Sequence, residues 1–106
     1  MDEIFDLTRR ELYIVNKNIE SAQMKFRVIS VFVFLKPLII KNNGYLRISI
    51  RELNELYRIE NFKFSDTLMR KIIVELINLK FLEIDKEQTG TVYCLPNIDI
   101  VESQYM

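Results

Sequence analysis

The chain changes its pattern abruptly between residues 65 and 96, and this change limits the folds that it can adopt. Apolar residues recur at helical spacing through "SDTLMRKIIVELINLK", and the pattern then alternates through "FLEIDKEQTGTVYCLP" around Gly90. Spacings of three and four predict a helix with one buried side, whereas alternation predicts strands. A glycine between two short alternating runs favours a hairpin. We therefore expect a helix that leads directly into a two-stranded hairpin, with Leu82 and Ile84 on the core side of its first strand.

Helix starts are well marked elsewhere in the chain. The segments "TRRE" at residues 8–11 and "SIRE" at residues 49–52 fit the capping box, in which a hydroxyl and a carboxylate satisfy each other's unpaired backbone amides. The second box predicts a helix from Ile50 to about Tyr57, preceded by a short strand at residues 45–48. Ser65 or Asp66 can cap a further helix.

The amino-terminal segment carries apolar residues at the spacing of a heptad repeat. This spacing predicts one long helix, or two collinear ones. Its apolar stripe would be buried against another helix. Pro37 should end or kink the helix near residues 34–36, although a further turn to Lys41 is an open alternative. The repeat consists of Leu12, Val15, Ile19, Ala22, Phe26, Ile29 and Val33.

Size and composition indicate a single domain. A chain of 106 residues buries roughly two thirds of the surface that its unfolded form exposes. The single cysteine, Cys94, excludes an intramolecular disulfide. The start of the chain is too acidic and polar for a signal peptide, and the most apolar run, at residues 28–40, is too short to span a membrane. We expect a cytoplasmic protein with no membrane partner.

The charges cancel in total but not along the chain. There are 15 basic and 15 acidic residues, and a neutral total weakens any inference from bulk charge to nucleic acid. The segment from Lys25 to Ile48 nevertheless holds several basic residues and no acidic one. A basic middle is thus flanked by more acidic ends.

The residue types needed for most catalytic sites are missing. The chain has no histidine and only two glycines, which excludes imidazole-dependent catalysis, imidazole metal sites and glycine-rich phosphate loops. Cys94 fits a small core residue better than a nucleophile. Glu83, Asp85 and Glu87 would share one side of a strand, where a solvated face explains them better than a metal site. We expect no enzyme activity, no metal and no cofactor.

The order of helix, short strand, helix, helix and hairpin resembles the winged helix-turn-helix superfamily of DNA-binding proteins. In many members the recognition helix ends in a leucine, followed after three residues by a glycine and an apolar pair, and the wing closes with a tyrosine and a leucine. The resemblance covers roughly residues 22–96, with Lys80 at the position of the usual glycine and a longer connector before the recognition helix. The matching positions are Leu76, Lys80, Phe81, Leu82, Gly90, Tyr93 and Leu95.

This resemblance implies a fold, a function and a set of contact residues. The expected fold is α+β and mostly α: a long amino-terminal helix over residues 1–21, a winged helix-turn-helix domain over 22–96 with a two-stranded wing, and a tail over 97–106. The helix at residues 65–80 would read the major groove of double-stranded DNA. The expected contacts come from the exposed side of this helix, from a flanking lysine, from the preceding helix and from the wing. They are Thr67, Arg70, Lys71, Val74, Asn78, Lys63, Arg51, Lys86, Gln88 and Thr89.

Several functional interpretations stay open at this point. The leading one is a dimeric transcription regulator, in which Leu12, Val15, Ile19, Ala22 and Phe26 form the dimer interface. The alternative for these residues is packing on their own domain. The general look of the chain is similar to small regulators and partition proteins of archaea, their plasmids and viruses, so a partition or replication role is an alternative. A protein-interaction module that does not bind DNA is another, because a fold does not determine a function.

Overall fold

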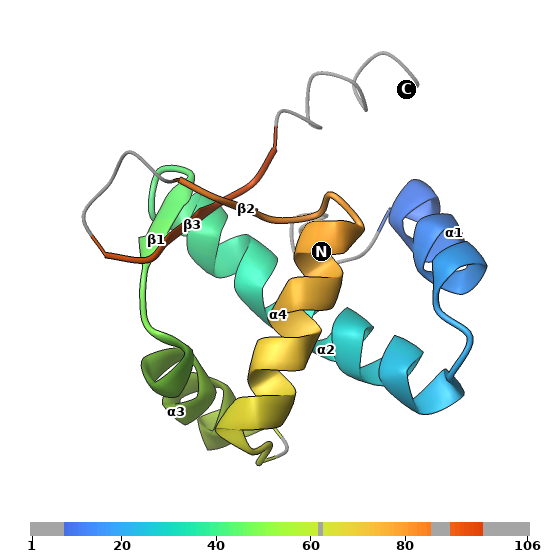
Figure 1. Ribbon diagram of the computed structural model, residues 1–106. Helices are drawn as coiled ribbons and strands as arrows, with labels where there is room; N and C mark the ends of the chain where they lie inside the picture. Colours follow the sequence, from blue (N-terminus) through green and yellow to red (C-terminus); the bar gives the residue numbers. More distant parts are fainter. Residues whose placement is uncertain (1–7, 62, 86–89, 97–106) are drawn as a thin grey trace.

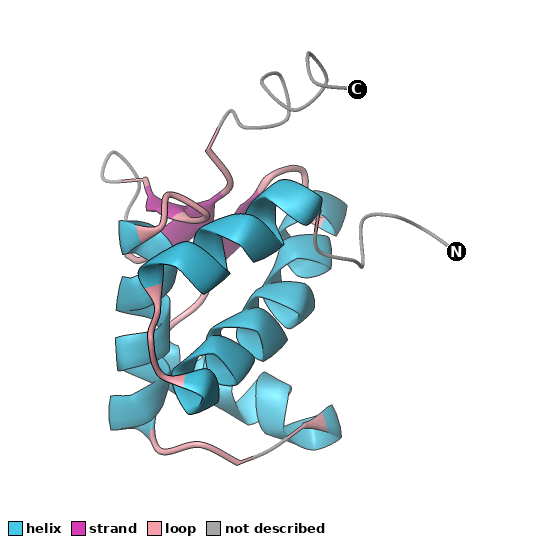
Figure 2. Cartoon of the chain, turned by 90° about the vertical axis from the view of Figure 1, so that its right-hand side faces the viewer, coloured by secondary structure: helices cyan, strands magenta, loops and turns pink. Residues whose placement is uncertain are grey.

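The structure, a computed structural model, describes residues 8–61, 63–85 and 90–96. These residues form an α+β fold that is mostly helical, as expected, with a three-stranded antiparallel sheet at one end of the helices (Figures 1 and 2). The elements are α1 Arg9–Asn18, α2 Ala22–Lys41, β1 Tyr45–Arg47, α3 Ile50–Glu60, α4 Asp66–Asn78, β2 Glu83–Ile84 and β3 Val92–Cys94.

The predicted helix starts are confirmed. Thr8 and Ser49 each form a complete capping box at the start of α1 and α3. The Ser65 hydroxyl caps α4 by accepting a hydrogen bond from the Leu68 backbone amide at 3.1 Å. Helix α3 runs to Glu60 rather than to Tyr57, which shortens the connector before α4 to residues 61–65.

The prediction of one long or two collinear amino-terminal helices is wrong. Ile19 and Ser21 have extended backbone conformations, and the Ser21 hydroxyl starts α2 anew by accepting from the Met24 amide at 3.2 Å. Helix α1 therefore turns aside from the axis of α2 (Figure 1). This bend places Val15 and Ile19 in the core, where they are 1% and 6% exposed, and their burial is the physical gain that favours it.

Helix α2 does not end before Pro37 but continues to Lys41. Proline lacks a backbone N–H, so the Val33 carbonyl loses its usual helical donor. The helix ends where Asn43 and Gly44 take positive φ angles of 61° and 91°, and the Gly44 amide donates to the Ile39 carbonyl at 2.8 Å. The alternative of a further turn beyond the proline is thus confirmed.

The sheet has the order β1-β3-β2, with β3 in the centre. Leu46 of β1 and Ile84 of β2 both pair with Tyr93 of β3, so these three residues share one side of the sheet. Tyr93 is buried, but Ile84 is 41% exposed. Ile84 therefore lies on the predicted side of the sheet, but it is only partly covered, because β2 is a short edge strand.

The core is organised around α2. Val28, Val31, Leu35 and Ile39 of this helix are fully buried, and α1, α4 and β1 all contact it. Aromatic rings extend the core: Phe32 stacks on Phe81 with 4.9 Å between ring centroids. Tyr57 of α3 is likewise fully buried, and it meets Phe34 of α2 edge-on at 5.3 Å.

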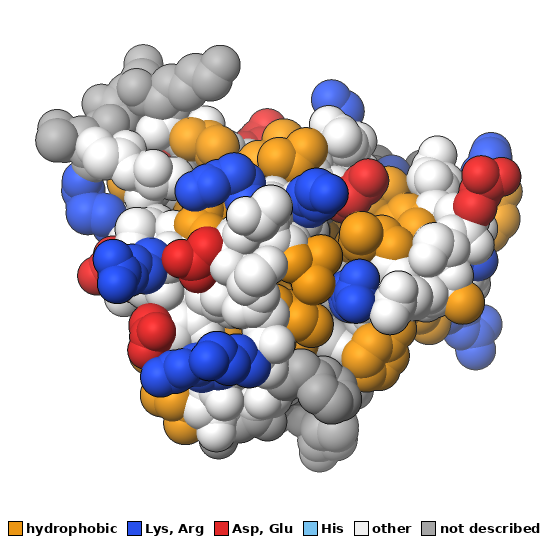
Figure 3. All heavy atoms as spheres, turned by 60° about the horizontal axis from the view of Figure 1, so that its bottom comes forward, with side chains coloured by type: hydrophobic (Ala, Val, Ile, Leu, Met, Phe, Trp, Pro, Cys, Tyr) orange, Lys and Arg blue, Asp and Glu red, His pale blue; other side chains and the backbone are white. Residues whose placement is uncertain are grey.

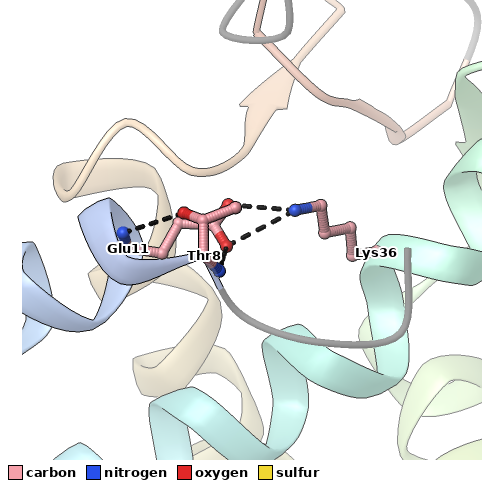
Figure 4. A network of polar contacts seen from close by, with 3 residues as sticks. All are labelled: Thr8, Glu11 and Lys36. Atoms are coloured by element: carbon pink, nitrogen blue, oxygen red, sulfur yellow. Dashed lines mark hydrogen bonds and ion pairs between the residues drawn. The ribbon is translucent and has the colours of Figure 1, made fainter. Parts of the chain in front are cut away.

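An ion pair buried in this core joins α1 to α2. The Lys36 ammonium lies 3.2 Å from Glu11 Oε2 and 3.4 Å from Oε1 (Figure 4). Glu11 is 1% exposed and Lys36 is 8% exposed. The Thr8 backbone amide also donates to Glu11 Oε1, at 2.9 Å. The carboxylate of the first capping box thus serves two roles, as a helix cap and as the anchor of α1.

Removing one member of this pair should destabilise the fold strongly. We expect Lys36→Met to lower the free energy of unfolding by about 3 kcal/mol, because the Glu11 carboxylate would remain buried without its countercharge. Urea denaturation would measure this change. The double variant Glu11→Leu/Lys36→Met should recover most of the loss, and an equal loss in both variants would contradict this account.

Helix α4 ends in a left-handed turn at Lys80, whose φ is 67°. The Lys80 amide donates to the Ile77 carbonyl and the Phe81 amide to the Leu76 carbonyl, both at 3.0 Å. This is the hydrogen-bond pattern of the Schellman motif, in which glycine is usual at the left-handed position. Lys80, which stands where the superfamily usually has glycine, adopts this conformation at a cost of about 1–2 kcal/mol.

Lys80→Gly should stabilise the protein. Relief of backbone strain exceeds the greater entropy that glycine loses on folding, and the net gain should be about 0.5–1 kcal/mol. Thermal unfolding would detect it as a higher midpoint. Lys80→Ala serves as the control, since it keeps a Cβ and should show no such gain.

Candidate nucleic-acid interface

Helix α4 presents one side to the core and the other to solvent. Met69, Ile72, Ile73 and Leu76 are buried. The opposite side is exposed as the sequence predicts, and it contains Thr67, Arg70, Lys71, Val74 and Asn78. Val74 is 49% exposed, although it is apolar. The helix thus offers a continuous outer surface that combines two cations with short polar and apolar side chains.

A buried asparagine fixes the start of α4 relative to α3. The Asn54 side-chain amide of α3 donates to the Phe64 carbonyl at 2.7 Å and to Asp66 Oδ1 at 2.9 Å. Asn54 is 7% exposed. Asp66 is the acidic residue in the first turn of α4, so its carboxylate is held against α3 by this hydrogen bond.

Phe64 packs the connector between α3 and α4 against the core. Phe64 stacks on Tyr57 with 5.4 Å between ring centroids, and the Arg27 guanidinium of α2 lies 5.9 Å from the Phe64 ring centre. The neighbouring Lys63 is exposed. The predicted flanking lysine therefore lies just before α4, on a segment whose next residue is anchored in the core.

Two arginines lie beside the central strand β3. Burial raises the pKa of the Tyr93 hydroxyl, and the nearby positive charge of Arg70 partly opposes this shift. On the other side, Arg47 of β1 pairs in register with Val92, and its Nη1 lies 3.5 Å from the position that a Cβ on Gly90 would take. Arg70 of α4 thus lies near Tyr93 of β3, and the Arg47 side chain of β1 lies beside Gly90, two residues before β3.

The cations of this surface are not paired with the carboxylates of the described chain. Arg58 pairs with Glu55 on α3 at 3.3 Å, but Arg51, Arg70 and Lys71 form no ion pair within residues 8–61, 63–85 and 90–96. Figure 3 shows the face around the lower ends of α3 and α4, where Lys and Arg side chains lie among neutral and apolar ones with scattered acidic groups. Among the described residues, no carboxylate forms an ion pair with these three cations.

The predicted contacts of the hairpin are only partly covered by the structure. Lys86, Gln88 and Thr89 lie outside the described residues. Glu83 at the base of the hairpin is exposed and Asp85 is half-buried. No group of three potential metal-binding side chains occurs among the residues that the structure describes.

The predicted dimerisation residues divide into two groups. Val15 and Ile19 are buried inside the chain's own core, so in this conformation they are not available to a partner. Leu12 and Phe26 are 41% and 53% exposed, and Ala22 is exposed as well. The alternative that the stripe packs on its own domain therefore describes its centre but not its ends.

Comparison with family models, curated proteins and solved structures finds no match to this chain. Within the described residues, no helix combines the length and apolar character needed to cross a membrane.

Sequence reasoning overlooked two features of this surface. Asn54 was not expected to orient α4, although a polar residue beside Leu53 and Tyr57 in the buried stripe of α3 could have indicated it. The closeness of Arg47 to Gly90 depends on the pairing of β1 with β3. Strand pairing of this kind joins distant segments, and no local pattern encodes it.

Cys94 should be a poorly reactive thiol. Burial raises its pKa first of all, and the negative charges of Glu83 and Asp85 raise it further. A raised pKa leaves less thiolate at a given pH, and the thiolate is the reactive form. At pH 8 the folded protein should therefore react with a disulfide reagent more slowly than the urea-unfolded chain.

Glu83→Gln tests the electrostatic part of this prediction. Removing one negative charge should lower the pKa of the thiol and speed the reaction of the folded protein. An unchanged rate in this variant would assign the slow reaction to burial of the sulfur and not to the charge of Glu83.

Proposed function

We propose that this protein binds double-stranded DNA as a winged helix-turn-helix transcription regulator, with α4 in the major groove. The observation that carries the proposal is the outer side of α4, where Arg70 and Lys71 are exposed and form no ion pair with a described carboxylate. The order of elements supports it by its resemblance to that superfamily: α2, β1, α3 and α4, followed by β2 and β3.

The side chains on α4 suit the chemistry of base edges. A helix fits the major groove, where an arginine can donate two hydrogen bonds to guanine, and a thymine methyl accepts apolar contact. Arg70 has the first role in this proposal, and Thr67 and Val74 have the second. Asn78 lies on the same side and can hydrogen-bond an adenine edge.

Cations around α4 would hold the duplex in register. Lys71 and Lys63 are exposed next to the reading side chains, and contacts to phosphate position a protein without specifying sequence. Arg51 lies in the first turn of α3, the helix that crosses the backbone in this motif. Arg47 at the end of β1, beside Gly90, would contact the DNA backbone next to the hairpin.

In this proposal the regulator binds DNA as a homodimer. In a two-fold dimer, two α4 helices would enter successive major grooves and read a palindromic site. A plasmid or viral partition or replication protein would use the same surface on DNA, so this alternative differs in biological role and not in the contacts.

A protein-interaction module is the second candidate. The formal net charge is zero, and α3 exposes Leu56 and Ile59, at 44% and 74%, one turn apart. Exposed apolar residues grouped on one helix are typical of protein contacts. This observation favours a partner on the side of α3, and it does not involve α4.

Removal of the two cations on α4 tests the DNA-binding proposal. We expect Arg70→Ala/Lys71→Ala to weaken binding to a mixed-sequence duplex by roughly 10–100-fold at low salt, and to make the slope of log affinity against log salt shallower by about 1 or more. Fluorescence anisotropy of a labelled duplex at several salt concentrations would measure both quantities.

The matched control is Arg9→Ala/Lys17→Ala. It removes the same charge from exposed positions on α1, outside the proposed surface. Equal losses in the two double variants would mean that α4 is not the contact helix. Absence of binding by the unaltered protein even at low salt would refute the proposal and favour the protein-interaction module.

A further inference from the structure

The heptad stripe of the sequence continues across the bend between α1 and α2. Leu12, Val15 and Ile19 precede the bend, and Ala22 and Phe26 follow it in the same register. The segment at residues 19–21 reads Ile-Glu-Ser and has neither proline nor glycine. Nothing in its local sequence forbids a helix. The bend is therefore held by the Ser21 cap and by the docking of α1.

The docking of α1 uses a small set of contacts on one side of the helix. Glu11 pairs with Lys36 of α2 at 3.2 Å, and Val15 and Ile19 enter the core that α2 organises. Each of these contacts joins α1 to a part of the chain beyond the bend. A second copy of the chain offers the same lysine and the same core surface.

We propose that two copies of this protein assemble by exchanging α1. In each copy the bend at residues 19–21 straightens, so that α1 and α2 become one helix over residues 9–41, about 50 Å long. The α1 segment of each copy then docks on α2 of the other, and the Glu11–Lys36 pair forms between chains. Exchange of an identical element is a low-cost route to a dimer, because it repeats contacts that already exist.

The straightened helix also gives the exposed part of the stripe a role. Leu12 and Phe26 are 41% and 53% exposed in the bent form. In one continuous helix they lie on the same stripe as Ala22, close to the point where two exchanged helices would pass each other. Covering these side chains is the extra gain that a dimer offers over two bent monomers. The inference concerns assembly alone and holds whether or not α4 binds DNA.

Reversing the buried charges in separate chains gives a direct test. Glu11→Lys alone places two ammonium groups together, and Lys36→Glu alone places two carboxylates together, so each variant should be destabilised. In an exchanged heterodimer both sites regain opposite charges. At one site the two substituted side chains, one from each variant, face each other as a reversed pair. At the other site the native Glu11 of the Lys36→Glu chain meets the native Lys36 of the Glu11→Lys chain.

The two variants would be unfolded in urea and refolded either separately or as an equimolar mixture. The expected result is a stable 1:1 dimer in the mixture only, seen by sedimentation and by a higher thermal midpoint than either variant has alone. A mixture that behaves as the sum of its two components would overturn the proposal. The single-chain variant Glu11→Lys/Lys36→Glu is the control that shows whether the reversed pair is itself tolerated.

The bend offers a second, independent test. Ala22→Pro places proline at the first position of α2, where it is favoured, but it would break a helix that continues through residues 19–21. It should leave the bent monomer folded and abolish the dimer. Ser21→Ala removes the cap of α2 and should raise the dimer fraction at a given concentration. Sedimentation equilibrium in which both variants match the unaltered chain would contradict exchange of α1.

Discussion

The fold depends on the need of α2 to be covered on several sides. Four of its residues, Val28, Val31, Leu35 and Ile39, are completely buried, and a helix that is apolar over much of its circumference cannot be stable at a surface. Helix α4, helix α1 and strand β1 supply the cover. The proposed DNA-binding surface is a product of this arrangement, because the same packing that buries one side of α4 directs Arg70 and Lys71 outward.

The Glu11–Lys36 pair has a different role from the apolar contacts. Burying two charges costs nearly as much as their attraction returns, so such a pair adds little net stability. An arrangement in which either charge is buried without its partner and without hydration is, however, strongly unfavourable. The pair therefore specifies where α1 docks, while Val15 and Ile19 provide most of the free energy of docking. Specificity and affinity for this helix come from different residues.

The sequence predicts local structure well where a short pattern decides it. Both capping boxes, the start of α4, strand β1 and the exposed side of α4 follow from spacing and side-chain chemistry within a few residues. The heptad stripe is misleading because a helical repeat indicates only which side is apolar, and contact with α2 decides whether the helix continues. The pairing of Lys36 with Glu11 and the incomplete cover of Ile84 likewise depend on segments far apart in the chain.

The left-handed lysine that ends α4 has an electrostatic side as well as a conformational one. Helix α4 has no basic residue in its last turn, so the Lys80 ammonium is the cation nearest in sequence to its carbonyl end. A positive charge there is favoured by the helix macrodipole by about 0.3–1 kcal/mol at low ionic strength, and salt screens this gain. Backbone strain is not screened. The net free-energy cost of lysine relative to glycine should therefore grow with salt concentration. The end of this helix should be most stable in dilute buffer.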